Sequence, residues 1–183
     1  NKTAIEDHFD HSFELEETLF AKGKAAALET VRGMIHEPGT VAYVRQQEPA
    51  GLGHAVWCAR HLIHDEPVAV LLADDLILGS SCLAEMVASY QGGNMVAVMD
   101  VPESETGSYG IITPGADHGQ LIEVSGLVEK PDPANAPSNI GVVGRYIIES
   151  GVFAQLGTQD RGAGNEVQLT DALARQIGKV PFH

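Results

Sequence analysis

Residues 67–78 read PVAVLLADDLIL, and this stretch decides the fold. Its continuous apolar run, Val68 to Ala73, ends abruptly in two adjacent carboxylates, Asp74 and Asp75. An apolar run this short favours a strand buried on both faces, as in a parallel sheet covered by helices. Ligands of such sheets lie beyond the carboxyl ends of the strands, where a carboxylate can hold Mg²⁺ against a phosphate. The alternative is that Asp74 and Asp75 only solvate the strand end or cap the next element.

The pattern around this stretch alternates strands and helices. The spacing predicts strands over Val41–Arg45, Val68–Ala73 and Met95–Val101, with helices over Gly51–Ile63 and from Ser80–Ser81 to Gly92 between them. Such an order implies right-handed crossovers and a largely parallel sheet. Three further extended stretches follow without long helices between them, so some pairing there is expected to be antiparallel: Tyr109–Thr113, Gln120–Glu129 and Asn139–Ile148. We therefore expect a mixed sheet.

Helices are expected at both ends of the chain. Near the beginning, the pattern predicts Phe13–Ala21, with Ser12 as its N-cap, and Ala25–Ile35. Near the end, it predicts Ser150–Leu156, closed by Gly157, and a helix over 165–177 capped by Asn165.

Composition limits the possible partners. The 183 residues predict a single domain. The formal net charge of −14 disfavours nucleic acid, whose binding needs a basic patch, but it does not disfavour a single nucleotide. Two cysteines, Cys58 and Cys82, without a metal-ligand pattern predict reduced thiols and a cytoplasmic protein. No apolar run approaches about 18 residues and no signal peptide is visible, so we expect no association with a membrane.

A glycine-rich helix entry is the first further candidate for a binding site. Residues 46–53 read QQEPAGLG, and the free N–H groups of a helix start beside two glycines suit a ligand rich in acceptors. The side-chain amide of Gln46 offers a donor and an acceptor together, which suits an imide edge such as that of uracil. An ordinary helix-entry loop is the alternative.

Two strand ends supply the other candidates. Gly110 beside Tyr109 would let a sugar ring lie against the backbone, although a glycine that only bends the strand is equally consistent. Lys130 is the one lysine between Ala25 and Gly178, and the following proline keeps it out of the helical region. Glu129 and Lys130 can serve one ligand only at a strand end or irregularity, because successive strand residues point to opposite faces. A solvated charge pair is the alternative.

Together these groups form a metal ligand, a phosphate-binding cation, a sugar-binding carboxylate and a base-reading amide. This set suits phosphoryl or nucleotidyl transfer, in which catalysis is mostly positioning and charge neutralisation.

Six motifs along the chain resemble the bacterial UDP-glucose pyrophosphorylases (UTP–glucose-1-phosphate uridylyltransferases). They stand in the family's order over nearly the whole sequence: HFDHSFELE (8–16), RQQEPAGLGHAV (45–56), PVAVLLADDLI (67–77), GLVEKP (126–131), PSNIGVVGRYI (137–147) and GAGNEVQLTDAL (162–173).

The resemblance implies an α/β fold of the nucleotide-diphospho-sugar transferase type, a Rossmann-like three-layer α/β/α sandwich around a mixed, mostly parallel sheet. It implies synthesis of UDP-glucose and pyrophosphate from UTP and α-D-glucose 1-phosphate with Mg²⁺ as cofactor, in a homo-oligomer. The residues that match the family's functional positions are Gln46 and Gly51 for the uracil, Asp74 for Mg²⁺, Lys130 for the sugar phosphate, and Gly110, Glu129 and Val142 for the glucose. Asp74 and Lys130 are the expected catalytic residues.

The sequence also departs from the family. The family's glycine-rich G-x-G-T-R loop and a later D-C-G stretch with a second metal-binding aspartate do not occur in residues 1–183. The resemblance therefore implies a nucleotidyltransferase domain that is incomplete at both ends. We expect these 183 residues alone to show little or no uridylyltransferase activity.

Two other functions stay open at this point. One is a sister sugar-1-phosphate nucleotidyltransferase, such as a thymidylyltransferase. The other is a non-catalytic sugar-nucleotide-binding subunit built on the same fold.

Overall fold

The computed structural model describes residues 3–183. It divides the chain into two compact units, one ending at Val44 and one spanning Arg45–His183, and each is described by itself. The single domain expected from chain length stays a prediction. Among residues 3–183, no helix combines the length and the apolar character needed to cross a bilayer.

The first unit consists of three helices: α1 (Thr3–His8), α2 (Phe13–Ala21) and α3 (Ala25–Arg32). The two longer helices are joined through Glu16, a buried carboxylate that accepts a 2.8 Å hydrogen bond from Arg32 Nε. This bond, followed by one with His11, holds the pKa of Glu16 below its usual value. Ser12 is the residue before α2, as predicted, although its side chain makes no capping hydrogen bond.

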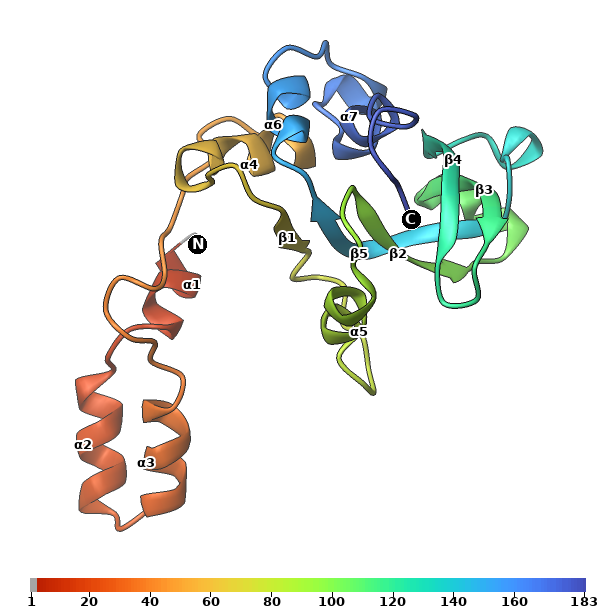
Figure 1. The fold of residues 1–183 in the computed structure, drawn as a ribbon. Helices are drawn as coiled ribbons and strands as arrows, with labels where there is room; N and C mark the ends of the chain where they lie inside the picture. The colour runs from red at the N-terminus through yellow and green to blue at the C-terminus, as the bar shows by residue number, and fades with distance from the viewer. Residues whose placement is uncertain (1–2) are drawn as a thin grey trace. The chain divides into compact units, whose positions relative to one another are not determined.

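The second unit contains a five-stranded sheet (Figure 1). Its strands are β1 (Val68–Leu71), β2 (Met95–Asp100), β3 (Gly110–Asp117), β4 (Ile122–Glu129) and β5 (Ile140–Ile148). The antiparallel pairing expected for the last three of these is confirmed: β3 pairs with both β4 and β5.

The prediction of a mostly parallel sheet is wrong, because β5 pairs antiparallel with both β1 and β2. Val68 lies opposite Ile148, and Met95 lies opposite Ile147. Two strands that are each antiparallel to the same third strand run parallel to each other. The crossover through α5 (Cys82–Ser89) therefore joins parallel strands, as the alternation implied, but β5 is inserted between them. All pairings between named strands in residues 3–183 are antiparallel.

The strand expected to be buried on both faces is partly exposed. Strand β1 ends at Leu71, two residues earlier than predicted, and it stands at the end of the strand order. Leu71 is 50% exposed, and Leu76 and Leu78 beyond it are each 83% exposed. The burial of β1 alternates, with Val68 and Val70 half-buried and Ala69 and Leu71 exposed, so only one face of the strand is covered.

The strand predicted over Val41–Arg45 does not form. These residues have no regular structure, and Val41, Tyr43 and Val44 are each at least 40% exposed. A strand needs a neighbour for its backbone N–H and C=O groups, and none of the described strands pairs with this segment.

The remaining elements of the second unit are short helices. The α-helices are α4 (Leu52–Cys58), α5, α6 (Gly151–Leu156) and α7 (Leu169–Ala174), and the 3₁₀ helices are η1 (Arg60–Leu62), η2 (Glu103–Ser108), η3 (Pro133–Asn135) and η4 (Ala163–Asn165). The predicted cap of α5 is confirmed, since Ser81 accepts a hydrogen bond from the backbone of Ala84. The long helix expected from Gly51 is divided into α4 and η1.

The predicted helix start at Asn165 is wrong, because tertiary pairing overrides the local signal. Asn165 has a left-handed backbone (φ 60°), and α7 begins only at Leu169. Between them, the backbone of Val167 pairs with the loop before α4: Val167 N–H donates to Ala50 O (2.8 Å), and Gly53 N–H donates to Val167 O (2.9 Å). These hydrogen bonds require an extended backbone at Val167, so α7 can begin only after it.

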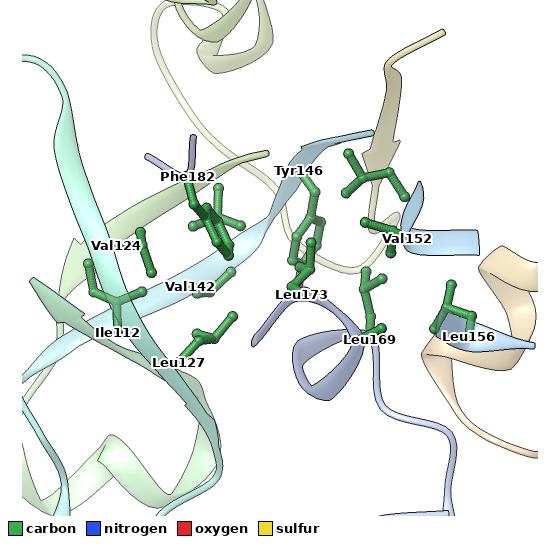
Figure 2. Close-up of a cluster of buried hydrophobic side chains, with 13 residues drawn as sticks. Ile112, Val124, Leu127, Val142, Tyr146, Val152, Leu156, Leu169, Leu173 and Phe182 are labelled. Atoms are coloured by element: carbon green, nitrogen blue, oxygen red, sulfur yellow. The ribbon is translucent and has the colours of Figure 1, made fainter. Parts of the chain in front are cut away.

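The hydrophobic core lies between the sheet and the helices α6 and α7. Figure 2 shows side chains from these elements meeting beside β5. The chain end contributes Phe182, whose backbone carbonyl accepts a hydrogen bond from Val124 (2.8 Å). The completely buried members of this cluster, with an exposed fraction of 0%, are Ile148, Val152, Ala172 and Leu173.

A matched pair of leucines tests this core. Leu173→Ala removes a completely buried side chain, and we expect it to lower the free energy of unfolding by about 2–5 kcal/mol. Leu78→Ala, at an 83% exposed position, should change it by less than about 0.5 kcal/mol. Urea unfolding of the two variants measures both effects. An equal decrease in the free energy of unfolding in Leu173→Ala and Leu78→Ala would contradict the described core.

Candidate functional site

Gly110, Glu129 and Thr170 meet where β3 begins and β4 ends. Gly110 and Glu129 are direct cross-strand partners. A Cβ atom placed on Gly110 would lie 3.3 Å from Thr170 Oγ1 of α7 and 3.4 Å from Glu129 Oε2. The glycine thus keeps a narrow space between a carboxylate and a hydroxyl, two groups that can bind sugar hydroxyls. Thr170 was not singled out from the sequence, where it is one polar residue in a helical pattern.

The Glu129–Lys130 pair has the strand-end irregularity that shared binding requires. Strand β4 ends at Glu129, and Lys130 turns into the left-handed region (φ 45°). Its N–H donates to Tyr109 O (3.0 Å), and its ammonium lies 3.7 Å from Glu129 Oε1. The Glu129 side chain is 13% exposed and the Lys130 side chain 54%. The largely buried carboxylate of Glu129 therefore lies beside the ammonium of Lys130, which is exposed to solvent.

The turn after β1 carries both aspartates and is tied to β5. Leu72 N–H donates to Gly144 O (2.9 Å), and Arg145 Nη1 donates to Leu72 O (3.0 Å). Asp74 and Asp75 are both exposed. The Asp75 carboxylate packs directly against Gly144, where a side chain would overlap it. The Asp74 carboxylate has no hydrogen bond or ion pair within the described residues.

Asp75 in the turn after β1 and Glu129 at the end of β4 both influence Tyr146 of β5. Burial raises the pKa of Tyr146 to about 12, and the negative charges of Glu129 and then Asp75 add to this shift. The effect of each carboxylate is smaller than that of burial. The end of β4 and the turn after β1, two segments far apart in the sequence, thus influence the same side chain.

The helix-entry loop at Gln46 packs on the segment before α7. Gln46 Nε2 donates to Gly51 O (3.0 Å) and lies 3.0 Å from His54 Nδ1. Gly51 has φ 98°, and a Cβ atom there would lie 2.6 Å from Glu166 Cβ. The group that closely approaches Gly51 is thus Glu166 of the same chain. A ligand could contact Gly51 only through its main-chain atoms.

Val142 differs from the other candidates. It is 9% exposed and belongs to the hydrophobic core, beside Ile112 and Leu127 in Figure 2. A contact between Val142 and a sugar would therefore fall to its main chain.

The grouping of the candidates rests on these contacts. The charges of Asp75 and Glu129 both influence Tyr146, and the segment from Glu166 to Thr170 contacts both Gly51 and Gly110. A cavity of about 420 Å³ in the same unit is lined by α5, β2 and the β3–β4 turn, and it includes none of the predicted site residues.

The donor set fits Mg²⁺ held jointly with a substrate. No group of three or more His, Cys, Asp or Glu side chains in residues 3–183 is arranged to hold a metal by itself. Mg²⁺ is commonly bound by one or two carboxylates together with substrate phosphates and water. The exposed oxygens of Asp74 match this mode of binding.

A high-pH titration tests whether the two carboxylates share Tyr146. Because the folded protein keeps the phenolic proton to a pH of about 12 and an unfolded chain releases it near about 10, the free energy of unfolding falls as the pH rises between these values. We expect Glu129→Gln and Asp75→Asn each to lower the pKa of Tyr146, measured by absorbance as the difference from Tyr146→Phe.

The control for this titration is Asp117→Asn at the end of β3, which should leave the pKa of Tyr146 unchanged. An unchanged pKa in both test variants would show that neither Asp75 nor Glu129 influences Tyr146.

Comparison with known proteins identifies the family and the fold of this chain. The family model described as nucleotidyl transferase matches residues 10–180. A UTP–glucose-1-phosphate uridylyltransferase of Komagataeibacter xylinus is 48% identical over 185 residues, which cover 100% of this chain and 65% of the relative. The chain thus spans slightly less than two thirds of that protein's length.

Two solved structures share the fold. A structure of UDP-glucose pyrophosphorylase without ligand has a TM-score of 0.89 at 38% identity, covering 100% of this chain and 68% of the other. A UDP-glucose pyrophosphorylase complexed with UDP-glucose has a TM-score of 0.86 at 36% identity, covering 99% and 67%.

Proposed function

Because this chain belongs to the nucleotidyl transferase family, we propose that the complete protein makes UDP-glucose and pyrophosphate from UTP and α-D-glucose 1-phosphate. The proposal rests on one observation: the whole of this chain aligns, at 48% sequence identity, with a relative named for this reaction. The proposal assigns each part of the two substrates to residues described above.

The uracil is assigned to the loop from Gln46 to Gly51. The loop is held against Val167 by backbone hydrogen bonds, so its main-chain groups are fixed before a nucleotide binds. A fixed set of donors and acceptors loses little conformational entropy on binding a base. The Gln46 amide and the main chain of Gly51 are the groups proposed to contact it.

The glucose is assigned to the corner formed by Gly110 and Glu129. The main chain of Val142 is proposed as a further glucose contact. Glu129 is largely buried, and its carboxylate can accept hydrogen bonds from sugar hydroxyls. Thr170 Oγ1 lies on the same side of Gly110 and adds a group able to donate and accept.

The phosphates are assigned to Lys130 and to Asp74 with Mg²⁺. When bound, Mg²⁺ neutralises charge on the triphosphate and fixes its geometry. Asp74 supplies the oxygen ligand, and Lys130 brings its ammonium to the sugar phosphate. In the reaction, a phosphate oxygen of glucose 1-phosphate attacks the α-phosphorus of UTP in line, the bond to the β-phosphate breaks, and pyrophosphate leaves.

This division of labour needs little covalent chemistry from the protein. Phosphoryl and nucleotidyl transfer are accelerated mainly by aligning the two substrates and stabilising the charge that spreads over the phosphate oxygens. The residues assigned above are proposed to contribute to both functions in the complete protein. We also propose that the complete protein acts in the cytoplasm, as a homo-oligomer.

Substrate choice is the direct test of the reaction. The complete protein, given glucose 1-phosphate and Mg²⁺, should release pyrophosphate with UTP and at least about tenfold more slowly with dTTP, because the base-binding loop is assigned to uracil. A coupled pyrophosphate assay measures both rates.

The same assay distinguishes the alternatives. Faster turnover of dTTP would identify a thymidylyltransferase. Binding of UDP-glucose without turnover of either nucleotide, equally tight with and without Mg²⁺, would identify a non-catalytic sugar-nucleotide-binding subunit.

Asp74→Asn and Lys130→Met test the proposed roles. Asp74→Asn should lower kcat by about 100-fold or more, because a neutral amide is a poor Mg²⁺ ligand. Lys130→Met should raise the KM for glucose 1-phosphate as well as lower kcat. Steady-state kinetics of the complete protein measure both, with circular dichroism as the test of folding.

Asp117→Asn serves as the control, since it changes a carboxylate at the end of β3, outside the proposed site. Wild-type kinetics in Asp74→Asn would refute the metal role of Asp74.

A further inference from the structure

Arg145 of β5 binds the turn that carries the aspartates through main-chain carbonyls alone. Its Nη1 donates to Leu72 O (3.0 Å) and to Gly144 O (2.8 Å), and its Nη2 donates to Asp75 O (2.6 Å). The guanidinium therefore spans the turn, with one contact before Asp74 and one after it. The carbonyl partners lie on both sides of the proposed metal ligand.

The turn has little else to hold it. Strand β1 has ended at Leu71, and the residues from Ala73 to Leu76 are exposed. A turn that is exposed and outside regular structure is expected to open locally at low free-energy cost. The hydrogen bonds from Arg145, with that from Leu72 N–H to Gly144 O, oppose such opening.

Gly144 completes the arrangement from the other side. Its backbone is left-handed (φ 49°), and its missing side chain leaves room for the Asp75 carboxylate to pack against the strand. Any larger residue would be strained at this φ and would also push Asp75 away. Glycine and arginine at consecutive positions of β5 thus fix the turn by shape and by hydrogen bonding.

We propose that Arg145, assisted by Gly144, is a positioning residue that holds the Leu72–Asp75 turn so that Asp74 meets the metal–nucleotide complex. This inference rests on the proposed function, because it gives Arg145 no contact with substrate. Groups that orient a metal ligand commonly contribute about 10–100-fold to metal affinity or activity. The planar fork of arginine suits the role, since lysine has one compact donor group and cannot span both carbonyls.

Two readouts on the complete protein test the proposal. In Arg145→Gln, hydrogen–deuterium exchange of peptides covering residues 71–78 should become faster. The affinity of the protein–UTP complex for Mn²⁺, measured by electron paramagnetic resonance, should fall about 10–100-fold. Activity measured against Mg²⁺ concentration should recover at high Mg²⁺, while the KM for glucose 1-phosphate changes less than about threefold.

Two further variants keep the test decisive. Gly144→Ala displaces the turn without removing the guanidinium, and it should also accelerate exchange in residues 71–78 and weaken Mn²⁺ binding. Arg145→Lys keeps the charge and should restore only part of the Mn²⁺ affinity. The matched control is Arg175→Gln, at an exposed arginine after α7, which should behave as wild type in both readouts.

The outcomes separate this inference from the proposed function. Wild-type Mn²⁺ affinity in both Arg145→Gln and Gly144→Ala would overturn the positioning role, as would exchange that rises evenly through the sheet. A wild-type protein that binds Mn²⁺ and UTP but releases no pyrophosphate would overturn the proposed function, whereas a selective effect of Arg145→Gln would still support the positioning role.

Discussion

Pairing of β5 on both of its edges is the constraint on which the second unit depends. The strand lies between β1 and β2 and also meets β3 at Gly141. Its buried residues, including Val142 and Ile148, belong to the main core, while Gly144 and Arg145 face the turn after β1. One strand therefore joins the hydrophobic core to the candidate site, so changes in core packing and in site geometry cannot be independent of each other.

A second constraint is the docking of residues 166–168 on the loop before α4. The two backbone hydrogen bonds of Val167 fix Gly51 and set where α7 begins. The start of α7 in turn sets where Thr170 meets Gly110. The proposed uracil and glucose contacts are thus positioned by one extended segment. Such a segment has no hydrophobic periodicity of its own, and its conformation is decided by its partner.

The sequence was informative where a signal is local. The apolar run over 95–101, the three extended stretches after it and the Ser81 cap all form close to where they were expected. The proline after Lys130 excludes the helical region, as expected, but the left-handed backbone there was not predicted, because a residue before proline is normally extended. Apolar runs, however, carry no information about which strand lies beside which, so the insertion of β5 could not be predicted. Arg145 and Asp75 are 70 positions apart, and neither shows in the sequence that it contacts the other. Tyr146 and Thr170 were missed for the same reason.

The charge of the candidate residues fits the Mg²⁺ of the proposed function. Asp74 and Glu129, which are proposed to contact metal or substrate, and Asp75 beside them are all carboxylates, in a chain of formal net charge −14. Of the two cations nearby, Arg145 has its donors directed at main-chain carbonyls, which leaves Lys130, half exposed, to meet a phosphate. A nucleoside triphosphate brought to this surface would face net repulsion from these groups. In the proposed function, a divalent cation held by Asp74 would offset this repulsion, so metal and nucleotide would bind together more strongly than either alone.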